Sequence, residues 1–256
     1  AHAAVRRVTA PERIPGRAGV RLLVTADHAS AAVPHGVALG VDAAAMTTHI
    51  AIDIGTAELA RGLAARLGAP AVIATVSRLV IDFNREPEAL GLIPHISDGV
   101  HIIGNDGLPD SERARRLNAY HAPYHAAIDA AVAETAPTLL VSIHSFTPQL
   151  ATRPDEARPW QVGILYNQDD RAARLGIASL AARGWNVGDN QPYSGRVLNA
   201  TMNRHAEARG LPYLGFEVRQ DQLANASGIE RWTDILAGVV AEVAALLPSR
   251  SEPAPR

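Results

Sequence analysis

Residue types that can do chemistry recur where apolar, strand-like segments of this sequence end. His28 and His144 each follow such a segment, and Arg78 and Glu217 lie at corresponding positions of two others. In open α/β sheets, ligands bind in the crevice beyond the carboxyl ends of the strands. Two histidines, an acid and an arginine that close four different strands therefore predict one shared site rather than four separate core residues.

Imidazole and carboxylate groups in this combination are typical of a hydrolytic metal site. Zinc in such sites takes three protein ligands, and water completes its shell. His28 and His144 are the predicted nitrogen ligands. Asp53 is the preferred third ligand, with His49 one helical turn away as its supporting partner, while Asp27 and His49 are alternatives for the ligand itself. Iron, cobalt or manganese would suit the same set of ligands.

Two of the strand-end residues remain for the chemistry of the reaction. Glu217 is a carboxylate outside the predicted ligand set, suited to taking a proton from a metal-activated water molecule. Arg78 can stabilise the negative charge that develops on the oxygen of an attacked carbonyl.

The segment Ser77–Arg85 places two arginines, an aspartate and an asparagine among apolar residues that favour burial. Buried guanidinium groups need anionic partners, from the protein or from a ligand. We expect Arg85 and Asn84 to hold a substrate carboxylate by a forked contact, and Asp82 to orient one of the arginines. The alternative is an internal arginine–aspartate lattice without a ligand.

Two irregular segments are expected to shape the substrate pocket. Residues 87–110 form a long stretch without clear periodicity, which is more often a functional loop than an idle one. The segment 186–196 contributes Asn190 and Tyr193 as predicted substrate-binding residues.

Three further histidines are assigned weaker roles. His121 and His125 are four residues apart, but Pro123 lies between them and no H-E-x-x-H pattern is present, so we expect structural or supporting roles. His205, beside Arg204, is a candidate pocket residue and nothing stronger.

Composition narrows the remaining functional classes. The 256 residues are 47% hydrophobic and 20% charged, which is typical of a globular chain. The net charge of −2 gives no sign of a nucleic-acid or membrane partner, and neither a membrane-spanning run nor a leader is apparent, so a cytoplasmic location is expected. The absence of cysteine and lysine excludes thiol nucleophiles, Schiff-base chemistry and lysine-dependent phosphate loops.

Strand-like and helix-like segments alternate along the chain. Strands are expected at 20–25, 70–76, 139–143, 161–166 and 213–218, and helices at 46–67, 110–135, 169–182, 197–209 and 228–247. This alternation predicts a three-layer α/β/α fold with a central, largely parallel mixed sheet. We expect a single catalytic domain over 1–256, with an irregular arm at 1–18 and a disordered tail at 248–256.

Together, the short motifs resemble the N-formylglutamate amidohydrolase family over about residues 20 to 245, in the same order. The motifs that carry this resemblance are Asp27-His28-Ala29-Ser30, Asp53-Ile54-Gly55, Ser77-Arg78-Leu79-Val80, Asn84-Arg85, Ser97-Asp98-Gly99, Pro123-Tyr124-His125, His144-Ser145-Phe146 and Gly215-Phe216-Glu217-Val218.

The resemblance implies a fold similar to that of zinc-dependent carboxypeptidases and aspartoacylases. In those relatives an arginine stabilises the oxyanion, an Asn-Arg pair binds the substrate carboxylate, and a glutamate late in the chain acts as the general base. By their order in the sequence, the residues that match these roles are Arg78, Asn84 with Arg85, and Glu217. The relatives take a metal ligand from a glutamate three residues after the first histidine, where this chain has Ala31. The resemblance therefore supports Asp53 as a replacement only indirectly.

These observations favour a zinc-dependent amidohydrolase that cleaves a small N-acyl amino acid, such as N-formylglutamate, and so acts as a deformylase. One alternative is a deacylase or carboxypeptidase-like hydrolase for a larger N-acyl or peptide substrate. The other is a non-catalytic binder of small acids, which would have no need for a carboxylate at the position of a base.

Overall fold

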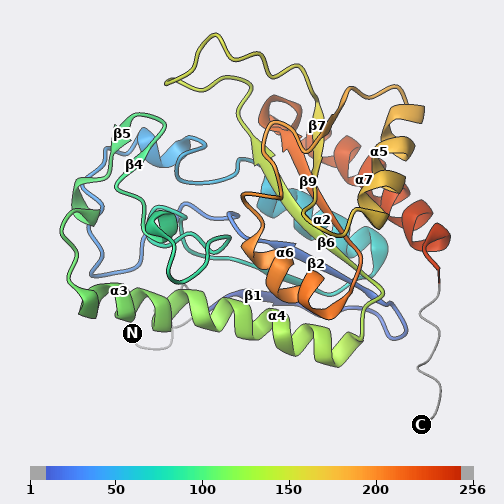
Figure 1. The fold of residues 1–256 in the computed structure, drawn as a ribbon, viewed down its shortest axis with the longest axis horizontal. Helices are drawn as coiled ribbons and strands as arrows, with labels where there is room; N and C mark the ends of the chain where they lie inside the picture. The colour runs from blue at the N-terminus through green and yellow to red at the C-terminus, as the bar shows by residue number, and fades with distance from the viewer. Residues whose placement is uncertain (1–9, 249–256) are drawn as a thin grey trace.

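Seven strands form one mixed sheet at the centre of the computed structural model, which describes residues 10–248 (Figure 1). Across the sheet the strands lie in the order β1-β3-β2-β6-β9-β7-β8. The four strands β3, β2, β6 and β9 run parallel, whereas β1 and β7 pair antiparallel with β3 and β9. In chain order, the strands are β1 (Glu12–Ile14), β2 (Leu22–Ala26), β3 (Ala71–Ile73), β6 (Leu139–Phe146), β7 (Val162–Leu165), β8 (Val187–Asp189) and β9 (Tyr213–Arg219).

Helices cover both faces of this sheet. They are α2 (Thr56–Leu67), α3 (Asp110–Arg116), α4 (Ala122–Thr135), α5 (Arg171–Ala182), α6 (Ala200–His205) and α7 (Ala226–Leu246). Helices α2, α5 and α7 pack together on one face, while α4 packs on β2 and β3 from the other face with α6 beside it (Figure 1). The expected three-layer α/β/α fold with a largely parallel mixed sheet is therefore confirmed.

The central strands form because their apolar sequences suit burial on both faces. All eight residues of β6 are buried, and β9 is buried from Tyr213 to Val218. Strands covered by helices on both sides read as continuous apolar runs, which is why these two were predictable. Among the described helices, none combines the length and apolarity that crossing a lipid bilayer requires.

Short or polar strands were missed. Strand β1 lies in the segment that was expected to be an irregular arm, and β8 was expected to be loop. A separate hairpin of β4 (Ile96–Ser97) and β5 (Val100–His101) lies within the long segment 87–110. Residues 1–9 of the expected arm, and all but the first residue of the expected tail, lie outside the described part of the chain.

The helix expected over 46–67 is wrong in its first half. A 3₁₀ turn at Ala45–Thr47 is followed by irregular chain, and α2 begins only at Thr56. The reason is Gly55, which has φ of 80° and whose missing side chain makes room for Leu223. His49 and Asp53 therefore do not share a helical face.

The helix expected over 110–135 is interrupted. A wide π-turn, Leu117–His121, joins α3 to α4, so that the three segments run on as one rod along the lower edge of Figure 1. Pro123 lacks an N–H group and cannot complete the regular ladder of hydrogen bonds at this point. Further along, the helix expected over 197–209 is reduced to α6 and a 3₁₀ turn at Glu207–Arg209.

Two glycines provide a matched test of this packing. A Cβ atom on Gly163 of β7 would lie 2.0 Å from the carbonyl oxygen of Gln191, whereas on Gly238, in the exposed surface of α7, its nearest neighbour is 3.8 Å away. Gly163→Ala should lower the free energy of unfolding by about 1–3 kcal/mol through overpacking. Gly238→Ala should raise it by ~0.5–1 kcal/mol through helix propensity. Urea unfolding measures both, and equal effects would contradict the packing described here.

Candidate metal centre and active site

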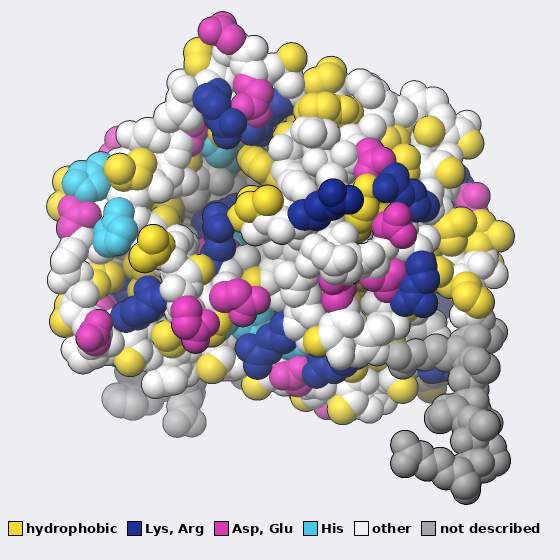
Figure 2. Space-filling view, viewed as in Figure 1, with side chains coloured by type: hydrophobic (Ala, Val, Ile, Leu, Met, Phe, Trp, Pro, Cys, Tyr) yellow, Lys and Arg dark blue, Asp and Glu magenta, His cyan; other side chains and the backbone are white. Residues whose placement is uncertain are grey.

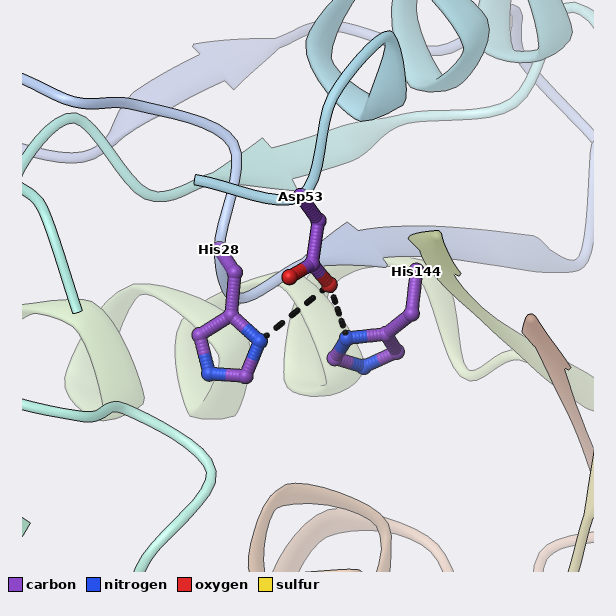
Figure 3. Close-up of side chains that lie close together, drawn as sticks. All are labelled: His28, Asp53 and His144. Atoms are coloured by element: carbon purple, nitrogen blue, oxygen red, sulfur yellow. Dashed lines mark hydrogen bonds and ion pairs between the residues drawn. The ribbon is translucent and has the colours of Figure 1, made fainter. Parts of the chain in front are cut away.

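Three buried side chains, His28, Asp53 and His144, converge on one point (Figure 3). One atom from each, all suited to binding a metal, lie within 4.8 Å of one another. Oδ2 of Asp53 lies 3.3 Å from Nδ1 of His28 and 3.0 Å from Nδ1 of His144. The two imidazoles thus present the same ring nitrogen to the same carboxylate oxygen.

Neighbouring strands bring these groups together. β2 pairs in parallel with β6, so that His28, just beyond β2, lies beside His144. His144 is within β6 rather than after its end, because this strand continues three residues beyond the predicted one. Asp53 is fixed by its backbone, whose N–H group donates to the carbonyl oxygen of His28 at 2.9 Å.

The outward nitrogens of both imidazoles have their own partners. Nε2 of His28 lies 2.7 Å from Oδ1 of Asp82, and Nε2 of His144 lies 3.1 Å from the hydroxyl of Ser142 and 3.4 Å from Oδ2 of Asp27. A proton on each Nε2 leaves each Nδ1 with a free electron pair directed inward. Carboxylates that orient histidine ligands in this way are usual around protein metal sites.

The alternatives for the third ligand are placed elsewhere. Oδ1 of Asp27 accepts a 2.6 Å hydrogen bond from the hydroxyl of Tyr124, on the outer side of His144. Nε2 of His49 lies 3.0 Å from Oδ2 of Asp98, a close contact without hydrogen-bond alignment. The geometry therefore favours Asp53.

The electrostatics of the three groups suit a cation. Burial would raise the pKa of Asp53, but His28, His144 and Arg78 hold it well below its usual range. Burial would lower the pKa of His144, but Asp27, Asp53 and Glu217 raise it well above its usual range. Both groups are thus strongly biased towards an ion pair, and a metal ion would take the place of the proton that His144 holds.

Glu217 is a buried acid with one oxygen that has no hydrogen-bond partner in the described part of the chain. In the register of the sheet it lies opposite His144, one strand further on, and it lines the same cavity. Its Oε2 atom is buried and has no hydrogen-bond partner among the described residues. Burial, with a contribution from Asp53, raises the pKa of Glu217 to about 7, despite the opposing effect of His144. A carboxylate with this pKa can both accept and return a proton near neutral pH.

Arg78 bridges two acids at the edge of the site. One guanidinium nitrogen donates to Oδ1 of Asp53 at 3.0 Å and another to Oδ2 of Asp82 at 2.9 Å. Burial would lower the pKa of Arg78, but these two carboxylates raise it. The expected contact between Asp82 and one of the arginines is thus present, and that arginine is Arg78.

Asn84 and Arg85 line the same cavity of about 270 Å³. In Figure 2 the surface of the protein is hollowed, with basic and histidine side chains in and around the hollow. Oδ1 of Asn84 accepts from the backbone N–H group of Thr201 at 3.0 Å. Within residues 10–248, no acidic side chain forms an ion pair with Arg85, whereas Arg78 has two. Arg85 is therefore the guanidinium group that is available to an anionic ligand.

Tyr193 and Asn190 differ in their placement. Tyr193 lines the cavity, and its hydroxyl accepts a 3.1 Å hydrogen bond from Arg158. Asn190 is not among the lining residues, so its expected contact with substrate is not supported. Its side-chain oxygen instead accepts from the backbone N–H groups of Tyr166 and Gly195, and its φ of 52° is typical of an asparagine in a tight turn.

Some lining residues were missed at the level of the sequence. An apolar part of the wall is formed by Phe146, Leu150, Leu165, Leu198 and Met202. Nothing in their spacing distinguishes them from core residues, because they come from four separate segments. In contrast, His205, a candidate pocket residue, is fully buried outside the cavity.

Comparisons with known proteins identify a family and similar structures. A model described as N-formylglutamate amidohydrolase matches residues 20–224. The gene product Atu2144 from Agrobacterium tumefaciens has a similar structure, with 31% sequence identity, a TM-score of 0.86, and 93% of this chain and 95% of that chain covered. The N-formylglutamate amidohydrolase from Ralstonia eutropha JMP134 is similar in fold, with 17% identity, a TM-score of 0.67, and 93% and 97% covered. No curated protein matches the chain.

The raised pKa of Glu217 predicts a specific dependence of stability on pH. The folded chain holds this proton up to about pH 7, against an ordinary value of 4.5, so its stabilisation is lost as the pH rises through that range. In metal-free protein, Glu217→Gln should therefore gain stability relative to the unmodified chain by ~2–3 kcal/mol between about pH 5 and about pH 8. Urea unfolding in the presence of a chelator measures this gain, and parallel pH profiles would contradict it.

Proposed function

The chain belongs to the N-formylglutamate amidohydrolase family, and on that premise we propose that it is a metal-dependent amidohydrolase for small N-acyl amino acids. The proposed substrate is an N-formyl amino acid such as N-formylglutamate. The observation that carries the proposal is the convergence of His28, Asp53 and His144 beside the unpartnered carboxylate of Glu217.

Zinc is the proposed metal, held by Nδ1 of His28, Nδ1 of His144 and a carboxylate oxygen of Asp53. The fit rests on two imidazole Nδ1 atoms that face one carboxylate oxygen, with an acid close to the outward nitrogen of each ring. When bound, such an ion supplies Lewis-acid chemistry, because it polarises the amide carbonyl and acidifies water.

Glu217 is proposed as the group that moves the proton. Its carboxylate would accept a proton from the attacking water and deliver it to the nitrogen of the departing amine. Amide hydrolysis needs this second step, since an amine leaves poorly unless it is protonated. A pKa of about 7 suits both halves of the task.

Arg78 is proposed to stabilise the negative charge that develops on the carbonyl oxygen. It is already held by Asp53 and Asp82, so that it can act without losing side-chain freedom during the reaction. Its two carboxylate partners also leave it less suited than Arg85 to binding a substrate carboxylate.

Arg85 and Asn84 are proposed to bind the carboxylate of the amino acid, with Tyr193 on the cavity wall nearby. Arg85 brings a guanidinium group without an ion-pair partner in the described chain, and its planar fork matches a carboxylate. The cavity of about 270 Å³ is suited to a small substrate of this kind.

A second candidate substrate class is favoured by the apolar wall. Leu150, Leu165, Leu198 and Met202 could accommodate a longer acyl group or an apolar amino-acid side chain by burying its surface. A screen of N-formylglutamate, N-formylleucine and N-acetylglutamate with the zinc-loaded enzyme separates the two classes. If the enzyme is a deformylase, N-formylglutamate and N-formylleucine should be cleaved faster than N-acetylglutamate.

Replacing Glu217 tests the mechanism. Glu217→Gln should retain stoichiometric zinc but lose hydrolysis by at least ~10³-fold, because the amide can neither take nor return a proton. Elemental analysis and initial-rate measurements with N-formylglutamate provide the two readouts. Glu230→Gln, at an exposed position, is the matched control and should leave both unchanged. Hydrolysis by Glu217→Gln at the rate of the unmodified enzyme would rule the mechanism out.

Replacing Arg85 tests the recognition of the carboxylate. Arg85→Leu should raise KM for carboxylate substrates by about 10- to 100-fold, since a charge-assisted hydrogen bond is lost, while the zinc content stays constant. Arg85→Lys keeps the charge without the fork and should give an intermediate KM. If Arg85→Leu bound carboxylate substrates with unchanged affinity, Ser77–Arg85 would instead be an internal arginine–aspartate lattice without a ligand.

A further inference from the structure

Three buried histidines lie together behind the segment that carries Asn84 and Arg85. His121 ends the π-turn before α4, His125 is on α4, and His205 ends α6. Their exposed fractions are 3%, 1% and 0%, and none of them lines the cavity. The proposed reaction assigns them no role.

Two of these histidines contact backbone carbonyl groups on either side of Asn84. Nε2 of His125 lies 3.0 Å from the carbonyl oxygen of Phe83, and Nε2 of His121 lies 3.1 Å from that of Arg85. The third, His205, contacts His125, with 2.8 Å between its Nε2 and Nδ1 of His125. The result is a continuous chain of imidazoles that ends on the proposed carboxylate-binding segment.

Helix α6 holds the same segment through a second residue. Thr201 donates its backbone N–H group to Oδ1 of Asn84 at 3.0 Å, and its hydroxyl donates to the carbonyl oxygen of Phe83 at 3.3 Å. Thr201 and His205 are one turn apart on α6, so they share a face. The segment is therefore braced from both α4 and α6.

The far end of the chain is anchored at an ion pair. Nδ1 of His205 lies 2.9 Å from Oδ1 of Asp129, and Nη1 of Arg209 lies 3.4 Å from the same nitrogen. Nη2 of Arg209 also donates to Oδ1 of Asp129 at 2.6 Å. Oδ1 of Asp129 thus accepts from both the ring and the guanidinium group.

The proton positions follow from the acceptors. Burial lowers the pKa of His125 to about 3, so this ring carries one proton at neutral pH. Carbonyl oxygens only accept hydrogen bonds, so protons on Nε2 of His121 and of His125 are needed to bind the carbonyl groups of Arg85 and Phe83. Nδ1 of His125 then accepts from Nε2–H of His205. The carboxylate of Asp129 also only accepts, so Nδ1 of His205 carries a proton as well.

We propose that His121, His125 and His205, each with a proton on Nε2, are positioning residues that hold the carbonyl groups of Phe83 and Arg85 and thereby aim Asn84 and Arg85 into the cavity. The expected effect on substrate binding rests on the proposed function, whereas the hydrogen bonds of the three histidines do not depend on it. Loss of the donor at His125 frees the segment without removing any group that contacts the substrate.

Two substitutions of His125 distinguish its role as a hydrogen-bond donor from a role in packing alone. His125→Gln places an amide N–H near the position of Nε2 and keeps the bond to Phe83, whereas His125→Asn places it near Nδ1 and loses that bond. His125→Asn should raise KM for N-formylglutamate by about 10-fold, with kcat changed far less, and His125→Gln should restore most of the affinity. Equal KM values for the two variants, or a fall in kcat alone, would overturn the proposal.

Two readouts are independent of activity. In hydrogen–deuterium exchange, the peptide covering residues 80–92 should exchange faster in His125→Asn than in His125→Gln, while the rest of the chain is unchanged. In ¹⁵N-histidine spectra of the unmodified protein, His121, His125 and His205 should all be protonated at Nε2. A proton at Nδ1 of His125 instead of Nε2 would contradict the hydrogen bond to Phe83 and overturn the proposal, even if both variants failed to fold. If the enzyme cleaved no N-acyl amino acid, the proposed function would fail. The spectra would still show whether the three histidines hold the segment through Nε2.

Discussion

The contact on which the site depends is that of one oxygen of Asp53 with Nδ1 of both His28 and His144. Four acids, Asp27, Asp53, Asp82 and Glu217, are buried around it. Burial of so many carboxylates is costly unless positive charge is close by, and within the described chain Arg78 and the two imidazoles supply it. A divalent cation bound to both Nδ1 atoms would supply this positive charge in place of the imidazole protons, which is the physical reason for regarding the cluster as a metal site.

The rest of the fold positions groups around this centre. Parallel pairing of β2, β6 and β9 places His28, His144 and Glu217 side by side, because neighbouring parallel strands end at the same edge of the sheet. The irregular chain before α2 brings Asp53 to the same edge. The stretch Ser77–Arg85 then divides by its contacts. Arg78 and Asp82 contact Asp53 and His28, whereas Asn84 and Arg85 line the cavity without an ion pair to a described acid.

Much of this arrangement was predictable from the sequence because strands buried on both faces have continuous apolar sequences. Of the residues expected at the strand ends, His28 and Arg78 follow β2 and β3, while His144 and Glu217 lie within β6 and β9. All four line one cavity. Strand β1, Glu12-Arg13-Ile14, was missed since it is stabilised by pairing with β3 rather than by its own pattern. Asn190 shows the converse limit, because a polar loop residue can serve a turn or a ligand, and only the fold decides.

X-ray absorption at the zinc edge, on protein loaded with one equivalent of zinc, identifies the ligands around the metal. We expect two imidazole nitrogens at about 2.0–2.1 Å and a carboxylate oxygen at about 2.0–2.2 Å, with water as the remaining ligand. In Asp53→Ala the protein carboxylate should be lost from that shell. A third imidazole in the shell, which would indicate His49, or no stoichiometric binding of zinc, would contradict this set of ligands.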